Sequence, residues 1–309
     1  MIRKNAIKTS FDELTSISSN NDSQILVSGN SKGQIFINSL LKNGLERNTI
    51  TFQIANSAIN DIVWMDKGTI VVATNLTEIL MLDLFKESIE KLEGHSKSIK
   101  TLTKLDENIF FSGGRDSKIL KWDLRENKNV LINCKSRNEK LDQSITSIAL
   151  NSKNNNKLYC SHTFPSSVDF FDLRYSHYGK YKEEKCLKTK NNILSFLHDE
   201  SSYFLYSLDI NNNIIKISDD CEKKQDLKKN NNLKSSFADS CYSKTFDLKI
   251  FTHKSSVTLV DRFDNTNVLD VKGCNGSVIT RNNLFTCTEN GEIVNYEIKE
   301  NREYLENLE

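Results

Sequence analysis

A repeat with a period of about 44 residues constrains the fold of this sequence more than any other feature. The most complete copy starts at Gly94-His95 and continues through β-rich runs at 98–102 and 108–112, a turn at 113–116 and a run at 118–123. Short β-rich runs separated by turn residues indicate strands that pair with their neighbours along the chain. Each copy therefore predicts one small antiparallel sheet.

Degenerate copies of this unit fill the rest of the chain, each with a pair of β-rich runs, a turn and a last run that ends in a polar or acidic residue. The seven units begin near residues 14, 58, 94, 144, 193, 237 and 276. Seven units in 309 residues match the blade length of β-propellers, about 40–45 residues. We predict an all-β fold, a single seven-bladed β-propeller that occupies residues 1–309 as one domain.

Such a ring must close, because an open stack of blades leaves unpaired strand edges that promote aggregation. We expect the segment from Ile2 to Lys8 to supply the outer strand of the last blade, next to Tyr296. The C-terminal tail is the alternative closing segment.

Charge and hydropathy narrow the function classes. Lys and Arg number 42 against 41 Asp and Glu, so no net field attracts nucleic acid or an anionic membrane. The N-terminal residues lack the apolar stretch of a signal peptide, and no apolar run is long enough to span a membrane. We expect a protein that is nuclear or cytoplasmic or both, monomeric by itself, with protein partners and without membrane or direct nucleic-acid contact.

The chain shows no sequence motif for a metal, a nucleotide or another cofactor. The cysteines are scattered, without a C-x-x-C pair, and predict reduced thiols: Cys134, Cys160, Cys186, Cys221, Cys241, Cys274 and Cys287. Four histidines lack metal-ligand spacing and are expected to have surface or loop roles: His162, His177, His198 and His253. The segments 180–190 and 221–234 read as exposed loops, the second with a nuclear-import signal or an acidic-partner contact as its alternative.

His95, Ser112 and Asp116 could suggest a Ser-His-Asp hydrolase, but their order and spacing fit a structural network. In that network His95 bridges Asp116 in a tight turn and Ser112 on the middle strand, with Trp122 below. A nucleophilic serine would need exposure and oxyanion donors, and the sequence around Ser112 indicates neither. The pairs Gly94-His95 and Trp122-Asp123 are typical of WD40 blades. We expect no catalytic residue.

Two segments, Trp122-Asp123-Leu124-Arg125 and Phe171-Asp172-Leu173-Arg174, end the third strand of successive blades, 49 residues apart. Both arginines are expected on the bottom rim, opposite the top face that carries His95 and Asp116. Paired guanidinium groups suit directional contacts with carboxylates or carbonyls of a partner. The alternative is that each arginine caps its own blade by pairing with the nearby aspartate.

Asp-x-Arg after WD or FD resembles the double motif by which WD40 substrate receptors attach to the adaptor of the cullin-4 RING ubiquitin ligase. The stretch 112–125, followed by 144–147 and the FDLR blade, is similar to the denticleless family, which recognises replication proteins bound to the sliding clamp. The resemblance covers roughly residues 55–220, and Phe171 stands where the second motif has Trp. It implies that the adaptor binds Trp122, Asp123, Arg125, Asp172 and Arg174.

These features together predict a non-catalytic receptor that presents replication or cell-cycle substrates for ubiquitination. Arg115, in the top turn of the third blade, is the candidate contact for a substrate. The first alternative is a generic WD40 scaffold in ribosome assembly, chromatin or trafficking. A hydrolytic propeller enzyme is the third hypothesis.

Overall fold

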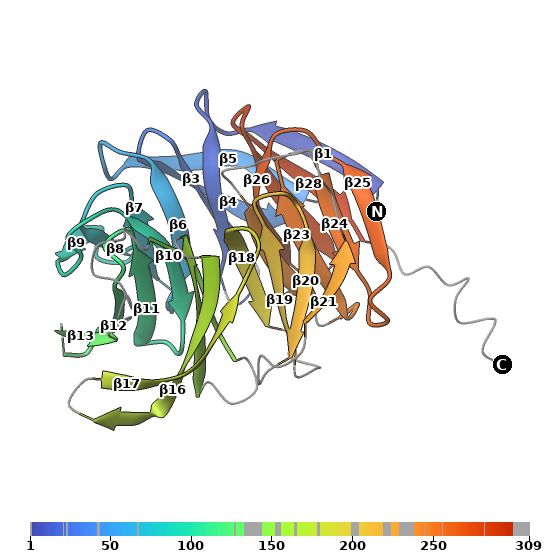
Figure 1. The fold of residues 1–309 in the computed structure, drawn as a ribbon. Coiled ribbons are helices and arrows are strands. Elements are labelled where there is room, and N and C mark those ends of the chain that lie inside the picture. Colours follow the sequence, from blue (N-terminus) through green and yellow to red (C-terminus); the bar gives the residue numbers. More distant parts are fainter. Residues whose placement is uncertain are drawn as a thin grey trace.

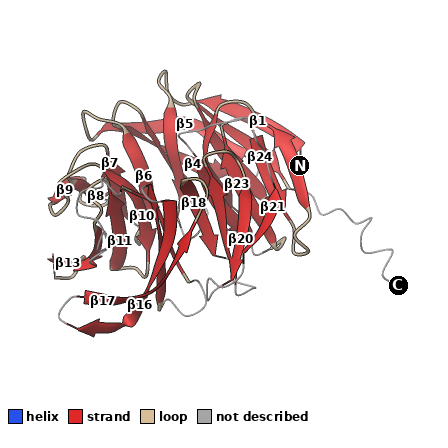
Figure 2. Cartoon of the chain, viewed as in Figure 1, coloured by secondary structure: helices blue, strands red, loops and turns tan. Residues whose placement is uncertain are grey.

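The computed structural model describes residues 2–20, 22, 24–41, 44–66, 68–126, 128–132, 144–151, 156–163, 166–177, 180–198, 204–218, 224–228, 238–243, 245–254, 256–280 and 282–298. Within these ranges the regular structure consists of strands joined by turns, with no helix (Figure 2). The strands form seven four-stranded antiparallel sheets. The sheets stand around a common axis (Figure 1), so the chain is a seven-bladed β-propeller, and the predicted fold class is confirmed.

The first three blades follow one another without a crossover. Blade 1 consists of β2 (Leu14–Ser19), β3 (Ile25–Asn30), β4 (Gln34–Leu41) and β5 (Gly44–Gln53). Blade 2 consists of β6 (Ile59–Trp64), β7 (Thr69–Thr74), β8 (Ile79–Asp83) and β9 (Ser88–Leu92). Blade 3 consists of β10 (Ile99–Lys104), β11 (Ile109–Gly114), β12 (Ile119–Asp123) and β13 (Lys128–Ile132).

The next three blades repeat this order, and the seventh borrows one strand. Blade 4 consists of β14 (Ile145–Leu150), β15 (Lys157–Thr163), β16 (Ser166–His177) and β17 (Lys180–Lys188). Blade 5 consists of β18 (Ile193–His198), β19 (Phe204–Asp209), β20 (Ile214–Ser218) and β21 (Lys224–Lys228). Blade 6 consists of β22 (Ala238–Ser243), β23 (Leu248–His253), β24 (Ser256–Val260) and β25 (Thr266–Asp270). Blade 7 consists of β26 (Cys274–Thr280), β27 (Asn283–Thr288), β28 (Glu292–Glu297) and β1 (Ile2–Lys8).

The N-terminal strand closes the ring, as predicted. β1 pairs antiparallel with β28, with Arg3 opposite Tyr296 and Lys8 opposite Glu292. In Figure 1 the blue first strand accordingly lies beside the red last strand. Ile7 packs against the core between the seventh and first blades. The first and last segments of the chain therefore stabilise each other in one sheet.

Hydrophobic cores lie between neighbouring blades, because each sheet buries both of its faces. Between blades 2 and 3, for example, Val71 and Ala73 of β7 share a core with Phe110 and Trp122. The rings of Phe110 and Trp122 stack at 5.9 Å with an angle of 8° between their planes. Full burial of one such side chain contributes about 1.5–3 kcal/mol. This double-sided burial explains why the middle strands read as continuous apolar runs.

The polar outer strands differ from the sequence prediction. Lys180–Lys188 and Lys224–Lys228 were expected in loops, yet they form β17 and β21, the outer strands of blades 4 and 5. An outer strand pairs along one edge only and exposes many side chains, so it needs no apolar alternation. Residues 221–223 and 229–234 lie outside the described ranges.

The third strand of blade 4 also runs further than predicted. β16 does not end at Asp172 but continues to His177, which pairs with Lys180 after a shift in register. The β16–β17 hairpin therefore extends past the other blades at the lower left of Figure 1. Arg174 lies within this strand and not in a turn beyond it.

A β-bulge recurs at one place in six of the seven blades, near the start of the innermost strand. The register shifts fall between Leu14/Ser16, Ile59/Asp61, Ile99/Thr101, Ile145/Ser147, Ile193/Ser195 and Cys274/Gly276. In four blades the bulged residue donates a side-chain hydrogen bond to the backbone carbonyl of the first residue in the innermost strand of the next blade. The pairs are Thr15 and Ile59 at 2.5 Å, Asn60 and Ile99 at 2.6 Å, Thr146 and Ile193 at 2.5 Å, and Asn275 and Leu14 at 2.7 Å. These bonds connect neighbouring blades around the channel.

Candidate functional site

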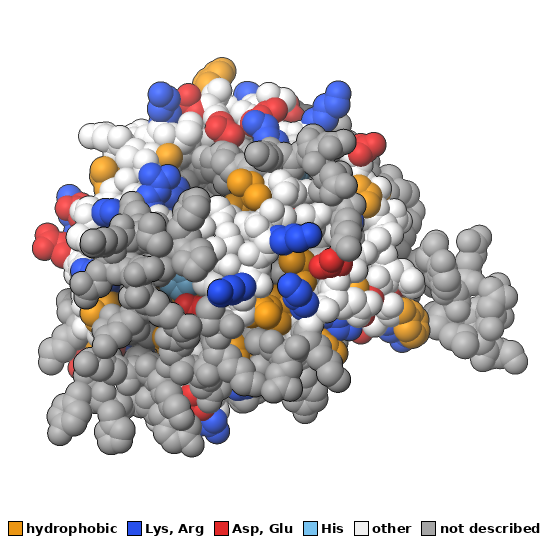
Figure 3. All heavy atoms as spheres, in the orientation of Figure 1, with side chains coloured by type: hydrophobic (Ala, Val, Ile, Leu, Met, Phe, Trp, Pro, Cys, Tyr) orange, Lys and Arg blue, Asp and Glu red, His pale blue; other side chains and the backbone are white. Residues whose placement is uncertain are grey.

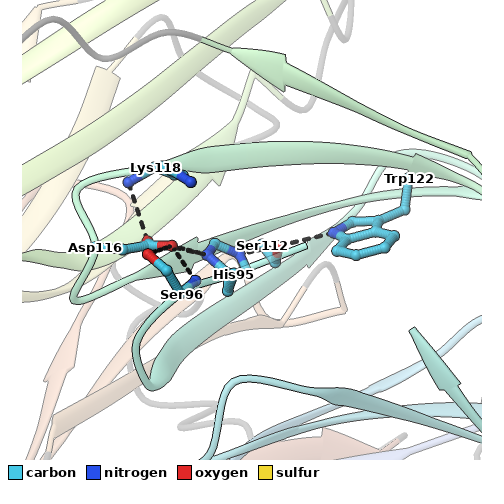
Figure 4. Close-up of polar contacts among 6 residues, drawn as sticks. All are labelled: His95, Ser96, Ser112, Asp116, Lys118 and Trp122. Carbon is cyan, nitrogen blue, oxygen red and sulfur yellow. Dashed lines mark hydrogen bonds and ion pairs between the residues drawn. The ribbon is translucent and has the colours of Figure 1, made fainter. Parts of the chain in front are cut away.

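The histidine-centred network of blade 3 forms one hydrogen-bonded chain (Figure 4). His95 Nδ1 lies 3.0 Å from both Asp116 carboxylate oxygens, and His95 Nε2 lies 2.7 Å from Ser112 Oγ. Trp122 Nε1 donates to the same Ser112 oxygen at 2.7 Å. Because a carboxylate only accepts, Nδ1 carries a proton, and in the neutral ring Nε2 accepts from the serine hydroxyl. These hydrogen bonds thus connect Asp116 in the top turn, through His95 and Ser112, to Trp122 near the bottom of the blade.

The same network fixes the charge of Asp116. Burial alone would raise the pKa of its carboxyl group, but hydrogen bonds from His95 and from the Ser96 backbone lower it below its ordinary value. Ser112 is 0% exposed, so its hydroxyl is enclosed by protein and cannot meet a substrate in this conformation. The geometry is that of a structural network, and it offers no support to the hydrolase hypothesis.

The Asp-x-Arg segments of blades 3 and 4 fold into nearly identical forks. Arg125 donates from Nε to Asp123 Oδ1 at 2.9 Å and from Nη2 to Asp123 Oδ2 at 2.6 Å. Arg174 donates in the same way to Asp172, at 2.9 and 2.5 Å. In each case the aspartate also accepts from the arginine backbone N–H. Both arginines are therefore oriented by the aspartate two residues before them, Arg125 just after β12 and Arg174 within β16.

The two forks differ in burial. Asp123 is 22% exposed and Asp172 is 0% exposed, whereas the arginines are 61% and 57% exposed. The hydrogen bond from Arg125 is the main cause that lowers the pKa of Asp123 to about 2. The hydrogen bond from Arg174 likewise lowers the pKa of Asp172. Each fork thus presents a charged group over an ionised carboxylate.

The same rim carries two exposed aromatic residues that the sequence analysis missed. Phe85 follows Asp83 at the end of β8, at the position of the arginine in the forks, and is 80% exposed. Phe263 follows Asp261 after β24 in the same way and is 70% exposed. Aligning the four third-strand ends by their aspartates would have revealed this pattern. The bottom rim therefore presents Phe85 beside the arginine pair of blades 3 and 4.

Arg115 lies at the top mouth of the central channel, where it lines a cavity of about 510 Å³. Lys100 on β10 shares this lining, and its pKa is lowered, first by burial and then by the charge of Arg115. Asp61 and Asp239 form part of the same wall. Arg115, the residue predicted to contact a substrate, thus lies at the opening of this cavity. The cationic groups of Arg115 and Lys100 lie nearer the solvent than the more deeply buried carboxylates of Asp61 and Asp239.

The two channel carboxylates are held by backbone groups of neighbouring blades. Asp61 Oδ2 accepts from the Leu102 N–H at 2.7 Å, and Asp239 Oδ2 accepts from the Ser277 N–H at 2.9 Å. Burial raises the pKa of Asp61 to about 7 and the pKa of Asp239 to about 6, and the charge of Asp239 adds to the shift of Asp61. Sequence analysis did not single out these residues, because no local motif marks the innermost position of a ring.

A further polar cluster lies in blade 4, on strands β15 and β16. Cys160, His162 and Asp169 place one potential metal-ligand atom each within 4.8 Å of one another. The expected surface or loop role of His162 was wrong, because the residue is buried, as are His198 and His253 in their strands. Sequence spacing could not reveal the cluster, since its members come from two paired strands.

The four cysteines whose side chains the structure describes form no disulfide: Cys160, Cys241, Cys274 and Cys287. Cys134 and Cys221 lie outside the described ranges, and Cys186 lies on β17. Over the described residues, no helix has the length and hydropathy needed to cross a membrane. On the face shown in Figure 3, basic and acidic side chains are interspersed.

The fold defines the class of this protein as a seven-bladed β-propeller with four-stranded antiparallel blades. No family model matches the chain, and a search of curated proteins finds no match.

Proposed function

We propose that this protein is a non-catalytic WD40 substrate receptor of a cullin-4 type ubiquitin ligase. Its bottom rim would bind the ligase adaptor through Trp122, Asp123, Arg125, Asp172 and Arg174, and its top face would present a replication or cell-cycle substrate. The observation that carries this proposal is the pair of equivalent Asp–Arg forks on adjacent blades.

The forks favour docking because they orient the guanidinium groups of both arginines before a partner binds. Each guanidinium is oriented by a two-point contact with its aspartate, while more than half of the arginine side chain stays exposed. An oriented side chain loses less conformational entropy on binding than a freely rotating one. Guanidinium groups also present several donors in a plane, which suits carboxylates and carbonyls on a protein surface. Phe85 adds an exposed apolar group to the same rim.

The top face supplies a separate surface for a substrate. Arg115 and Lys100 line the mouth of the channel and place two cationic groups next to each other. An acidic or phosphorylated segment would pair with both. This arrangement supports Arg115 as a substrate contact.

A generic WD40 interaction scaffold, in ribosome assembly, chromatin or trafficking, is the second candidate. Each arginine forks onto its own aspartate, and this geometry is also what a local cap of the blade would show. In that case the arginines would stabilise the strand ends and bind no adaptor.

Affinity purification from the organism's own cells distinguishes the two. The tagged chain and its Arg125→Glu/Arg174→Glu variant would be isolated in parallel, and the retained proteins identified by mass spectrometry. The receptor hypothesis expects the ligase adaptor and cullin with the wild type and at least roughly tenfold less with the variant, as for loss of interface hot spots.

The matched control is Arg262→Glu, which reverses an arginine beside the corresponding turn of blade 6. It should retain the adaptor, and thermal unfolding should show that both variants are folded. If the wild type and the double variant bring down the same unrelated assembly, the scaffold candidate is supported and the ligase role is excluded.

A further inference from the structure

The cluster of Cys160, His162 and Asp169 brings three potential zinc-ligand atoms together in blade 4. His162 Nε2 lies 3.3 Å from Cys160 Sγ and 3.1 Å from Asp169 Oδ2, so one ring nitrogen approaches both a sulfur and a carboxylate oxygen. A cation placed among the three atoms would account for both approaches.

The two separations from His162 Nε2 agree with those around a tetrahedral zinc ion. Zinc bonds of about 2.3 Å to sulfur and about 2.0–2.1 Å to nitrogen or oxygen place neighbouring ligand atoms roughly 3.3–3.6 Å apart. The separations of 3.3 and 3.1 Å lie within a few tenths of an ångström of that range. Thiolate, imidazole and carboxylate are also the three side-chain ligands that zinc accepts.

The donor set of the cluster matches the charge of a divalent ion. One thiolate from Cys160 and one carboxylate from Asp169 would neutralise such an ion, with His162 as a neutral ligand. A neutral assembly costs far less to bury than separate charges.

In blade 3 the positions that correspond to Cys160 and Asp169 hold Ser112 and Leu120. Cys160 lies opposite Ile148 and Asp169, just as Ser112 lies opposite Leu102 and Leu120. Ser112 joins the indole of Trp122 to His95, but blade 4 has Phe171 at the tryptophan position, and a phenyl ring donates no hydrogen bond. Blade 4 thus holds Cys160 at the position of Ser112 and Asp169 at the position of Leu120.

We infer that Cys160 Sγ, His162 Nε2 and Asp169 Oδ2 bind a zinc ion that holds β15 and β16 together. Cys160 binds the ion as a thiolate and its thiol proton passes to solvent, and His162 binds through unprotonated Nε2. The site is structural, because Cys160 and His162 are both buried and Cys160 packs in the core between blades 3 and 4. It is independent of the ligase proposal, since it makes no use of either rim.

The test is the metal content of the full chain, produced with zinc in the medium and dialysed against metal-free buffer. Mass spectrometry of the metal should find about one zinc per folded wild-type chain. Cys160→Ser and Asp169→Asn, which nearly preserve side-chain volume, should each retain at least roughly tenfold less. Cys287→Ser, the same change at a buried cysteine of blade 7, should retain zinc as the wild type does.

Cobalt gives a reading that does not depend on any variant being folded. Wild-type chain stripped of metal and loaded with Co²⁺ should show a thiolate-to-cobalt charge-transfer band, with visible bands of tetrahedral cobalt. A folded wild type that retains no zinc and shows no thiolate band with cobalt would overturn the inference. Equal zinc in Cys160→Ser and the wild type would do the same.

Discussion

The side-chain amide of Asn275 donates a 2.7 Å hydrogen bond to the backbone carbonyl of Leu14, 261 residues away in the chain. The same amide lies 2.9 Å from Glu13 Oε1. These contacts join the innermost strands of blades 7 and 1, while β1 completes the opposite, outer edge of blade 7. The ring is therefore held at two radii at the one junction that chain connectivity does not secure.

Asn275→Ala should lower the free energy of unfolding by about 1–3 kcal/mol, because it leaves the buried carbonyl of Leu14 without this donor. Urea unfolding at equilibrium measures the change. Asn267→Ala, at an exposed position of β25, is the control and should stay within about 0.5 kcal/mol of the wild type. Equal stability of the two variants would show that the amide contributes little to closure.

Removal of residues 1–10 should cost more than about 4 kcal/mol, because it leaves β28 unpaired and takes Ile7 from its core. Thermal unfolding followed by circular dichroism measures the loss. A peptide of residues 1–10 added in trans should restore part of the melting temperature. An unchanged transition after truncation would contradict closure by β1.

Trp122→Phe should destabilise the chain by about 1–2 kcal/mol more than Trp64→Phe. Both tryptophans are buried and both variants lose similar volume, but only Trp122 Nε1 has a hydrogen-bond partner, Ser112. The difference between the two unfolding free energies isolates that bond. Equal losses would mean that packing alone decides the effect.

Arg174→Ala should lower the melting temperature more than Arg125→Ala. The two arginines make the same fork, but Asp172 is fully buried and Asp123 is partly exposed to water. Loss of Arg174 leaves a buried carboxylate without its main cation, whereas water can solvate Asp123. Thermal unfolding in one buffer gives the order, and the reverse order would contradict this account.

Stability should fall as pH rises from about 4 to about 7 through the two channel carboxylates. Their folded pKa values, about 7 for Asp61 and about 6 for Asp239, exceed the ordinary value of 3.8. The folded chain therefore binds more protons than the unfolded chain in this window, and deprotonation at higher pH costs stability.

Asp61→Asn/Asp239→Asn should remove this pH dependence, because an amide keeps the hydrogen-bond acceptor and never ionises. At about pH 8 the variant should melt on the order of 2–4 °C above the wild type, and at about pH 5 the difference should shrink. The channel also holds Lys100, Lys104, Arg115 and His198, which both proteins share. Parallel pH profiles would rule out the carboxylates as the cause.

The blades could be predicted from sequence because their middle strands must be apolar on both faces. Ile70, Val71, Val72 and Ala73 of β7 are all completely buried, and such runs are visible without alignment. The outer strand Lys224–Lys228 is polar and pairs with β20 only, so its pattern does not differ from that of a loop. Local sequence carries no signal for a strand whose pairing is decided by its neighbour.

The candidate sites also divide into those that local sequence can predict and those that depend on contacts between distant strands. All members of the His95 network lie within one repeat of the sequence, between His95 and Trp122, so a single copy of the repeat predicts them. The contact of Asp61 with Leu102 joins residues 41 apart in different blades, and the Cys160 cluster depends on the register of β15 with β16. Ring geometry and strand register therefore decide what spacing along the chain cannot show.

Closure by β1 also sets the order of events during synthesis. β1 leaves the ribosome about 280 residues before its partner β28, which is roughly 15–60 s earlier at typical elongation rates. During that time blades 1 to 6 can form one after another, while β1 has no partner strand. The native ring is therefore completed only after β28 has been translated, and a nascent chain stalled before Glu292 has an open edge.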